Sequence, residues 1–101
     1  YRMALNTEDF RPYGESVIAA LTDWAKAQVG VSLADDNFEG VRVNFSPERG
    51  NGWCLLRMSL HEPLMPLNIE SDDVGGVDKI ANELYPVLKG FDKLDTEKLR
   101  G

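Results

Sequence analysis

The stretch Gly40-Val41-Arg42-Val43-Asn44-Phe45 decides the fold that this sequence predicts. Apolar and polar residues alternate along it without a break, which is the pattern of a β-strand with one face in a core and the other in solvent. Residues 46–52 hold a proline and two glycines, and residues 53–58 then return as a second apolar strand. Two strands separated by a loop of this length predict an antiparallel hairpin.

The segments flanking the hairpin predict two more strands. Residues 1–8 contain a short stretch in which apolar residues alternate, and residues 64–70 form a longer strand. Pro66 lies inside this longer strand. Because proline has no backbone N–H to donate to a ladder, it indicates an edge strand or a bulge.

Two helices are expected, one before and one after the hairpin. Over residues 15–29 apolar side chains recur at helical spacing, and Gly30 is a natural C-terminal stop. Ser71 is the expected N-cap of the second helix, in which Pro86 kinks or ends the regular part before Gly90 stops it. The apolar stripe of this second helix is Val77, Ile80, Ala81, Leu84 and Leu88.

This order of elements predicts an α+β fold in two layers. Residues 1–90 form one domain in the order strand, helix, three strands, helix, with a four-stranded antiparallel sheet and both helices on one face of it. The other sheet face is then open to solvent or to a partner. Residues 91–101 are polar and charged and are expected to fray as a tail.

Composition restricts the classes of function. The chain has 101 residues and a net charge of −6, which fits one domain and argues against binding to nucleic acid or to an anionic membrane. Its only cysteine, Cys54, lies in an apolar run and is expected to be a buried thiol in a reducing cytoplasm. No apolar run is long enough to span a bilayer. The start at Tyr1, without an initiator methionine or a signal-peptide pattern, suggests a piece of a longer protein.

The segment Arg57-Met58-Ser59-Leu60-His61-Glu62-Pro63 carries the candidate site. A guanidinium and a hydroxyl lie two residues apart at the end of an apolar strand, and a proline then turns the chain. Donors that converge on an exposed turn suit a phosphate group. In so acidic a chain, the positive charge that binds an anion must be local.

Each residue of this segment has a plainer alternative. Arg57 could form a surface ion pair, and Ser59 could shape the turn as well as donate to a phosphate. His61 could be a solvated residue, and Glu62 could be an acid–base group or a brace for the turn. No metal site is predicted, because His61 has no second ligand at metal spacing. The paired aspartates at 35–36 and 72–73 lack the spaced oxygens of a calcium loop, and Trp24 and Trp53 are assigned to the core.

Four segments together resemble the C-terminal domain of the α-D-phosphohexomutases, the phosphomannomutase/phosphoglucomutase family. They are the strand 40–45, the pair Gly52-Trp53, the pattern Leu56-Arg57-x-Ser59-x-x-Glu62-Pro63, and the strand that ends at Glu70. The resemblance is strongest over residues 39–70 and looser over residues 1–90. It implies a fold similar to one half of the TATA-binding protein, without DNA binding.

The resemblance implies a role within a larger enzyme. Family members have four domains, in which the first carries a phosphorylated catalytic serine, the second binds Mg²⁺ and the third reads the sugar. The fourth holds the substrate phosphate while an intramolecular phosphoryl transfer interconverts hexose 1-phosphate and hexose 6-phosphate through a bisphosphorylated intermediate. The expected partners of this chain are therefore a phosphosugar and the other domains of its parent. Alone, the domain is expected to be inactive and to hold no cofactor.

Carried over by position, the resemblance assigns substrate-phosphate binding to Arg57, Ser59, Leu60 and His61, and turn shaping to Glu62 and Pro63. Leu60 stands where members often have asparagine or glycine, and His61 where they usually have threonine. Pro66 stands where members often have a basic residue. These departures leave an alternative open, in which the chain is a non-catalytic binding module or an inactive mutase paralogue that docks a protein partner.

Overall fold

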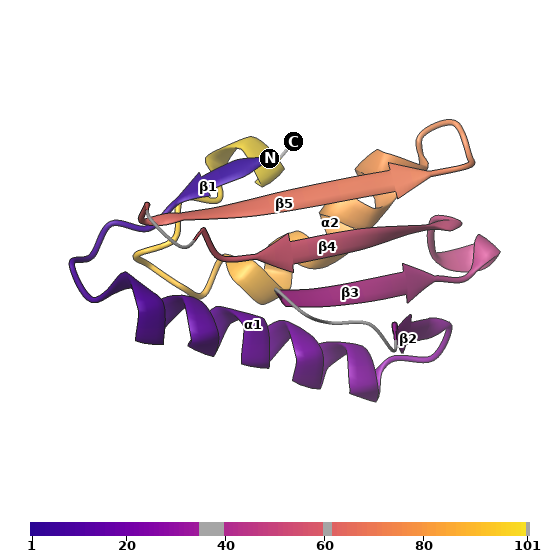
Figure 1. Ribbon diagram of the computed structural model, residues 1–101. Helices are drawn as coiled ribbons and strands as arrows, with labels where there is room; N and C mark the ends of the chain where they lie inside the picture. The colour runs from indigo at the N-terminus through magenta and orange to yellow at the C-terminus, as the bar shows by residue number, and fades with distance from the viewer. Residues whose placement is uncertain (35–39, 60–61, 101) are drawn as a thin grey trace.

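Five strands form one antiparallel sheet in the computed structural model, which describes residues 1–34, 40–59 and 62–100. The strands lie in the spatial order β1-β5-β4-β3-β2 (Figure 1). Their bounds are β1 Arg2–Ala4, β2 Val31–Leu33, β3 Gly40–Phe45, β4 Gly52–Arg57 and β5 Leu64–Ser71. The predicted hairpin is present, because β3 pairs with β4 from Gly40↔Arg57 to Phe45↔Gly52.

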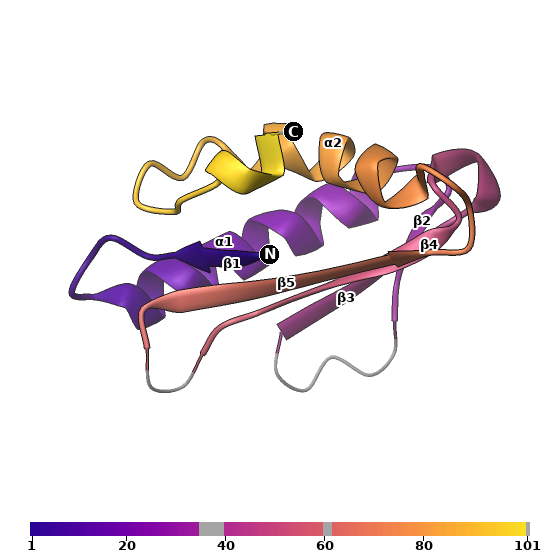
Figure 2. The ribbon, with the colours of Figure 1, turned by 90° about the horizontal axis from the view of Figure 1, so that it is seen from above.

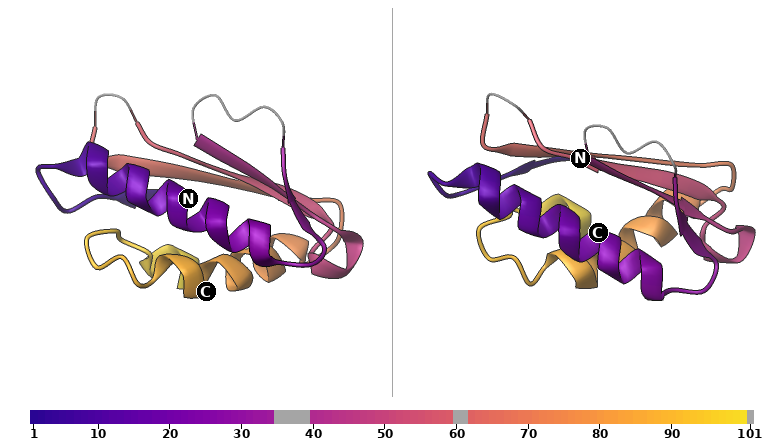
Figure 3. Two further views of the ribbon diagram at one scale, coloured as in Figure 1. Left: turned by 90° about the horizontal axis from the view of Figure 1, so that it is seen from below. Right: turned by 60° about the horizontal axis from the view of Figure 1, so that its bottom comes forward.

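The helices α1 (Phe10–Ala27) and α2 (Gly76–Leu88) both lie on one face of this sheet. Figures 2 and 3 show the two helices side by side on that face, and none of the described helices lies on the opposite face. Two short 3-10 helices, η1 (Pro47–Arg49) and η2 (Glu97–Arg100), complete the described elements. The prediction of a two-layer α+β domain with an open sheet face is confirmed at this level.

The predicted strand count was wrong, because β2 adds a fifth strand at the edge of the sheet. It pairs with β3 through Val31↔Phe45, Ser32↔Asn44 and Leu33↔Val43. Three residues are too few to establish an alternating pattern in a sequence. The strand follows directly on Gly30, whose φ of +79° turns the chain from α1 into the sheet.

Alternation along the strands places one apolar layer against the helices. Every second residue of β3 and β4 is buried, and the stripe of α2 closes over them. Buried side chains from the sheet include Val41, Val43, Phe45, Cys54, Leu56, Met65 and Leu67, and from the helices Val17, Leu21, Ile80, Leu84 and Leu88. None of the described helices is long and apolar enough to cross a membrane.

Both tryptophans were assigned to the core, but only one of the two packs against it. Trp24 packs against the core and lies 6.4 Å from Phe45 between ring centroids. Trp53 was wrongly assigned, because it alternates with the buried Cys54 and therefore faces the open side of the sheet. There the Arg42 guanidinium stacks over its ring at 4.3 Å.

Both helix starts differ from the sequence prediction. Helix α1 begins at Phe10, because Pro12 falls in its first turn, where a missing N–H costs no hydrogen bond. Gly14 is also helical, and a Cβ there would lie 2.4 Å from the sulfur of Met58, so glycine permits close approach to the sheet. Ser71 is the last residue of β5 rather than an N-cap; its hydroxyl accepts a hydrogen bond from the Asp73 N–H and donates to the Gly50 carbonyl.

The C-terminal segment that was expected to fray packs onto the domain over residues 91–100. Leu94 is 5% exposed and Leu99 is 1% exposed. The Asn6 N–H donates to the Lys93 carbonyl at 2.7 Å, and the Asp95 N–H donates to the Ala4 carbonyl at 2.9 Å. The tail therefore pairs with the residues at the end of β1. Its polar composition did not reveal this pairing.

Cys54 is buried as predicted, and burial raises the pKa of its thiol to about 12. The folded state thus favours the protonated thiol, so this group stabilises the fold below the ordinary thiol pKa and loses that contribution as pH rises toward 12. We expect native protein at pH 8 to resist alkylation by iodoacetamide, with full reaction after denaturation. Mass spectrometry before and after unfolding measures this, and rapid labelling of folded protein would contradict it.

Candidate functional site

A hollow of about 430 Å³ opens at one end of the sheet, where β4 leads into β5 beside β1. Its lining residues are Tyr1, Arg2, Arg57, Ser59, Glu62, Leu64, Pro66 and Asn68. We call it the Arg57 hollow. It contains two of the four residues expected to bind phosphate, Arg57 and Ser59, while Leu60 and His61 lie outside the described residues.

The register of the sheet brings the side chains of the Arg57 hollow to the open face. Arg57 is paired with Gly40 at the end of β4, and Ser59 is two residues further on. The Ser59 N–H donates to the Leu64 carbonyl at 2.9 Å, so the segment after β4 still pairs with the start of β5. Because residues two apart on extended chain point the same way, Arg57 and Ser59 share the face opposite to the helices.

Pro66 forms the floor of the hollow. The strand β5 is internal, between β1 and β4, so the edge position suggested by this proline was wrong. The Leu67 N–H donates to the Tyr1 carbonyl, which directs the nitrogen of Pro66 toward β4. The β4–β5 register ends at Leu56↔Leu67, one pair before Arg57 would meet Pro66, because this proline has no N–H to donate.

The short proline ring also creates the space of the hollow. Arg2 is the partner of Pro66 in β1, and Arg57 lies on its other side in β4. Two long cationic side chains therefore flank a side chain that is small and uncharged. A longer residue at position 66 would occupy the volume between them.

The guanidiniums of Arg2 and Arg57 make no ion pair or side-chain hydrogen bond within the described parts of the chain. Other arginines are used structurally. The Arg49 Nε lies 2.8 Å from the Glu83 Oε1, and its Nη1 donates to the Val29 carbonyl at 2.6 Å. Two cations that face one hollow without a protein partner suit an external anion. Glu62 adds one carboxylate to the lining and offsets part of this positive charge.

Backbone hydrogen bonds fix the turn around Glu62 and Pro63. The Leu64 N–H donates to the Glu62 carbonyl at 2.8 Å, and the Leu5 N–H donates to the Pro63 carbonyl at 2.7 Å. The second bond ties the turn to the chain just after β1, which carries Arg2. Both bonds are accepted by backbone carbonyls, and the turn-shaping role that the resemblance assigns to the two side chains stays a prediction.

Sequence reasoning missed Arg2 and Asn68 as members of the site. Their alternation with buried neighbours places both on the open face. Nothing in the sequence, however, shows that β1 lies beside β5, and only this neighbourhood brings Arg2 to the hollow. Asn68 follows Pro66 by two residues on the same face and adds an amide to the rim.

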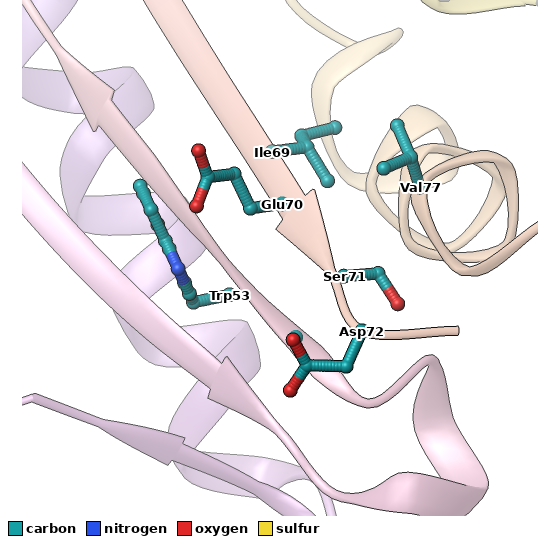
Figure 4. Close-up of a pocket in the computed structure, with 7 residues that line it drawn as sticks. Trp53, Ile69, Glu70, Ser71, Asp72 and Val77 are labelled. Atoms are coloured by element: carbon teal, nitrogen blue, oxygen red, sulfur yellow. The ribbon is translucent and has the colours of Figure 1, made fainter. Parts of the chain in front are cut away.

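A second hollow, of about 410 Å³, lies at the opposite end of the sheet. Figure 4 shows Trp53 and Glu70 on one side of β5 and Ile69 and Val77 on the other, with Asp72 below. None of the described residues that line it is cationic, and Glu70 and Asp72 contribute carboxylates. Of these two hollows, the Arg57 hollow is therefore the one whose described lining suits a phosphate.

No group of three or more histidine, cysteine, aspartate or glutamate side chains suited to a metal ion occurs within residues 1–34, 40–59 and 62–100. Asp73 accepts a hydrogen bond from the Asn51 amide at 3.1 Å, whereas Asp35 and Asp36 lie outside the described residues.

The sequence matches no model of a known protein family and no curated protein. A functional assignment therefore depends on the residues that line the Arg57 hollow and on the resemblance in the sequence.

Proposed function

We propose that this domain binds the phosphate group of a sugar phosphate, as the C-terminal domain of a cytoplasmic phosphohexomutase. One observation carries the proposal. Arg57 and Ser59, the two described residues that the resemblance assigns to phosphate, line the same hollow, and the Arg57 guanidinium has no partner among the described residues. A volume of about 430 Å³ lies in the range of small-molecule sites.

The chemistry of the lining supports a phosphate ester as the ligand. A guanidinium offers two parallel N–H groups to two phosphate oxygens, and such charge-assisted bonds are shorter and stronger than neutral ones. Ser59 adds a hydroxyl donor. On the rim, the Asn68 amide is available to a sugar hydroxyl.

The role proposed for the domain is positioning rather than chemistry. In the parent enzyme, a clamp on one phosphate would hold the other end of the hexose at the catalytic serine, which belongs to another domain, as does the Mg²⁺ site. Closure of the domain over the substrate would also keep water from the phosphoserine. The isolated domain is therefore inactive as a mutase and binds phosphosugar weakly, with a dissociation constant of about 1 mM.

A second candidate function is a binding module for a protein partner. It is favoured by Trp53 and Leu55, which lie partly buried on a sheet face that neither α1 nor α2 covers. In this case a phosphosugar would not bind, and a partner would contact the middle of the sheet instead of the Arg57 hollow.

Replacing Arg57 with glutamine tests the proposal. We expect the affinity for glucose 1-phosphate to fall about tenfold to a hundredfold, because a hydrogen bond to a charged group contributes about 1.5–3 kcal/mol. An NMR titration measures the dissociation constants. Arg42→Gln is the matched control, since it removes the same charge from the same sheet face but Arg42 stacks on Trp53 and does not line the hollow. Equal affinities for Arg57→Gln and wild type would contradict the proposal.

A further inference from the structure

We infer that Arg2 is a second phosphate-binding residue, and that it makes the Arg57 hollow selective for doubly charged phosphate monoesters over singly charged esters. The inference rests on the proposed function and adds the charge class of the ligand. It concerns a residue outside the Arg57–Pro63 segment, in a different strand.

The sheet places Arg2 and Arg57 on opposite sides of one small residue. Pro66 is the register partner of Arg2 in β1, and continuing the β4–β5 register by one pair past Leu56↔Leu67 brings Pro66 opposite Arg57. Neighbouring strands lie about 4.8 Å apart, so the backbones at the two arginines are separated by about 10 Å across β5. Both side chains lie on the open face and line the same hollow. An anion seated over the Pro66 ring would therefore be approached by a guanidinium from each side.

The charges that face the hollow favour a dianion. Among the described residues that line it, Arg2 and Arg57 contribute guanidiniums and Glu62 a carboxylate, while the N-terminal ammonium of Tyr1 donates to the Leu67 carbonyl at 2.8 Å. Neither guanidinium has an ionic partner among the described residues. A phosphate monoester carries close to two negative charges above its second pKa of about 6. Two cations on one site match that charge better than they match a single negative charge.

Other cations on the open face do not share this position. Arg42 lies two residue pairs along the β3–β4 ladder from Arg57, its guanidinium stacks on Trp53, and it lines no part of the hollow. Leu64 and Pro66, which also line the hollow, carry no charge. Among the side chains that line the hollow in the described part of the chain, Arg2 is thus the one other than Arg57 that can bring a full positive charge to the bound anion.

Coulomb attraction is proportional to the product of the charges, so Arg2 contributes about twice as much free energy to a dianion as to a monoanion in the same place. Glucose 6-phosphate and glucose 6-sulfate provide this comparison, because at pH 7.5 the phosphate is largely dianionic and the sulfate carries one charge. A fixed pH also leaves the protonation state of His61 the same in every arm.

The experiment is a set of NMR titrations of the wild-type chain, Arg2→Gln, Arg57→Gln and Arg42→Gln with both esters, at pH 7.5 and an ionic strength of about 0.15 M. We expect Arg2→Gln to weaken phosphate binding about tenfold and sulfate binding only about threefold, the square root of that factor. Arg42→Gln should leave both affinities within about twofold, because exposed charges outside the site are screened. Arg2→Lys, which keeps the charge, should restore most of the preference for phosphate.

Each outcome separates the inference from the proposed function. If Arg57→Gln loses phosphate binding but Arg2→Gln does not, the proposed function stands and the role of Arg2 is refuted. If Arg2→Gln weakens both esters by the same factor, or Arg2→Lys is no better than Arg2→Gln, Arg2 does not select for charge. If neither Arg2→Gln nor Arg57→Gln changes the affinity, both proposals fail. The backbone, not the Arg2 side chain, holds β1 to β5, so these variants are expected to fold.

Discussion

Replacing Pro66 with glutamate is expected to abolish measurable binding of glucose 1-phosphate while the domain stays folded. The new carboxylate would lie between Arg2 and Arg57 and form ion pairs with both of them. It would also fill the space over the floor of the hollow and repel the incoming anion. Since each lost charge-assisted contact is worth about 1.5–3 kcal/mol, the affinity should fall by more than about a hundredfold.

The matched control for this variant is Pro66→Val. Valine is similar in size, carries no charge and is favoured in strands. It also supplies the N–H that the β4–β5 ladder lacks at this position. We expect this control to bind the sugar phosphate as the wild type does. Comparable binding by Pro66→Glu and Pro66→Val would show that the anion does not lie between the two arginines.

Truncating Leu99 to alanine is expected to cause a large loss of stability, although Leu99 lies in a segment whose composition suggests a frayed tail. Leu99 is 1% exposed, and η2, which contains it, packs against α2. A buried leucine cut to alanine typically costs about 2–5 kcal/mol, because the transfer free energy is lost and a cavity remains. For a domain of about 100 residues, this lowers the melting temperature by about 10 °C or more.

Lys98→Ala is the control for Leu99→Ala, since Lys98 is the exposed neighbour and surface changes of this kind stay within about 0.5 kcal/mol. Circular dichroism melts measure both variants. An unchanged melting temperature for Leu99→Ala would mean that the tail is frayed after all. The tail also matters to the site, because its hydrogen bonds run along the chain at the end of β1, and β1 carries Arg2.

The strand β3 was predictable because its residues alternate over six positions, enough to fix both the strand and its buried face. The stripe of α2 was predictable for the same reason, and Ile80, Leu84 and Leu88 are buried as expected. The returning strand β4 was predictable as an apolar run, but its consecutive apolar residues did not show which face is buried. Short-range signals failed where tertiary packing decides. The three residues of β2 form a strand because they pair with β3. Pro12 lies in the first turn of α1, where its missing N–H removes no helical hydrogen bond.

Of the eight described residues that line the Arg57 hollow, the sequence had pointed to three, which are Arg57, Ser59 and Glu62. Arg57 and Ser59 share a face because they are two residues apart on an extended chain, which needs no knowledge of the fold. Arg2 joins them only through the spatial order β1-β5-β4, which pairs segments more than 60 residues apart. The wrong assignment of Trp53 has a similar cause, since aromatic character alone does not say which face of a strand is covered.

The most direct test of phosphate binding at the Arg57 hollow is an NMR titration of the isotope-labelled domain with glucose 1-phosphate up to about 50 mM, well above the expected dissociation constant. Saturable amide shifts centred on Arg57, Ser59 and Arg2 are the predicted result. Shifts centred on Glu70 and Asp72 at the opposite end of the sheet, or no saturable shift at all, would contradict it.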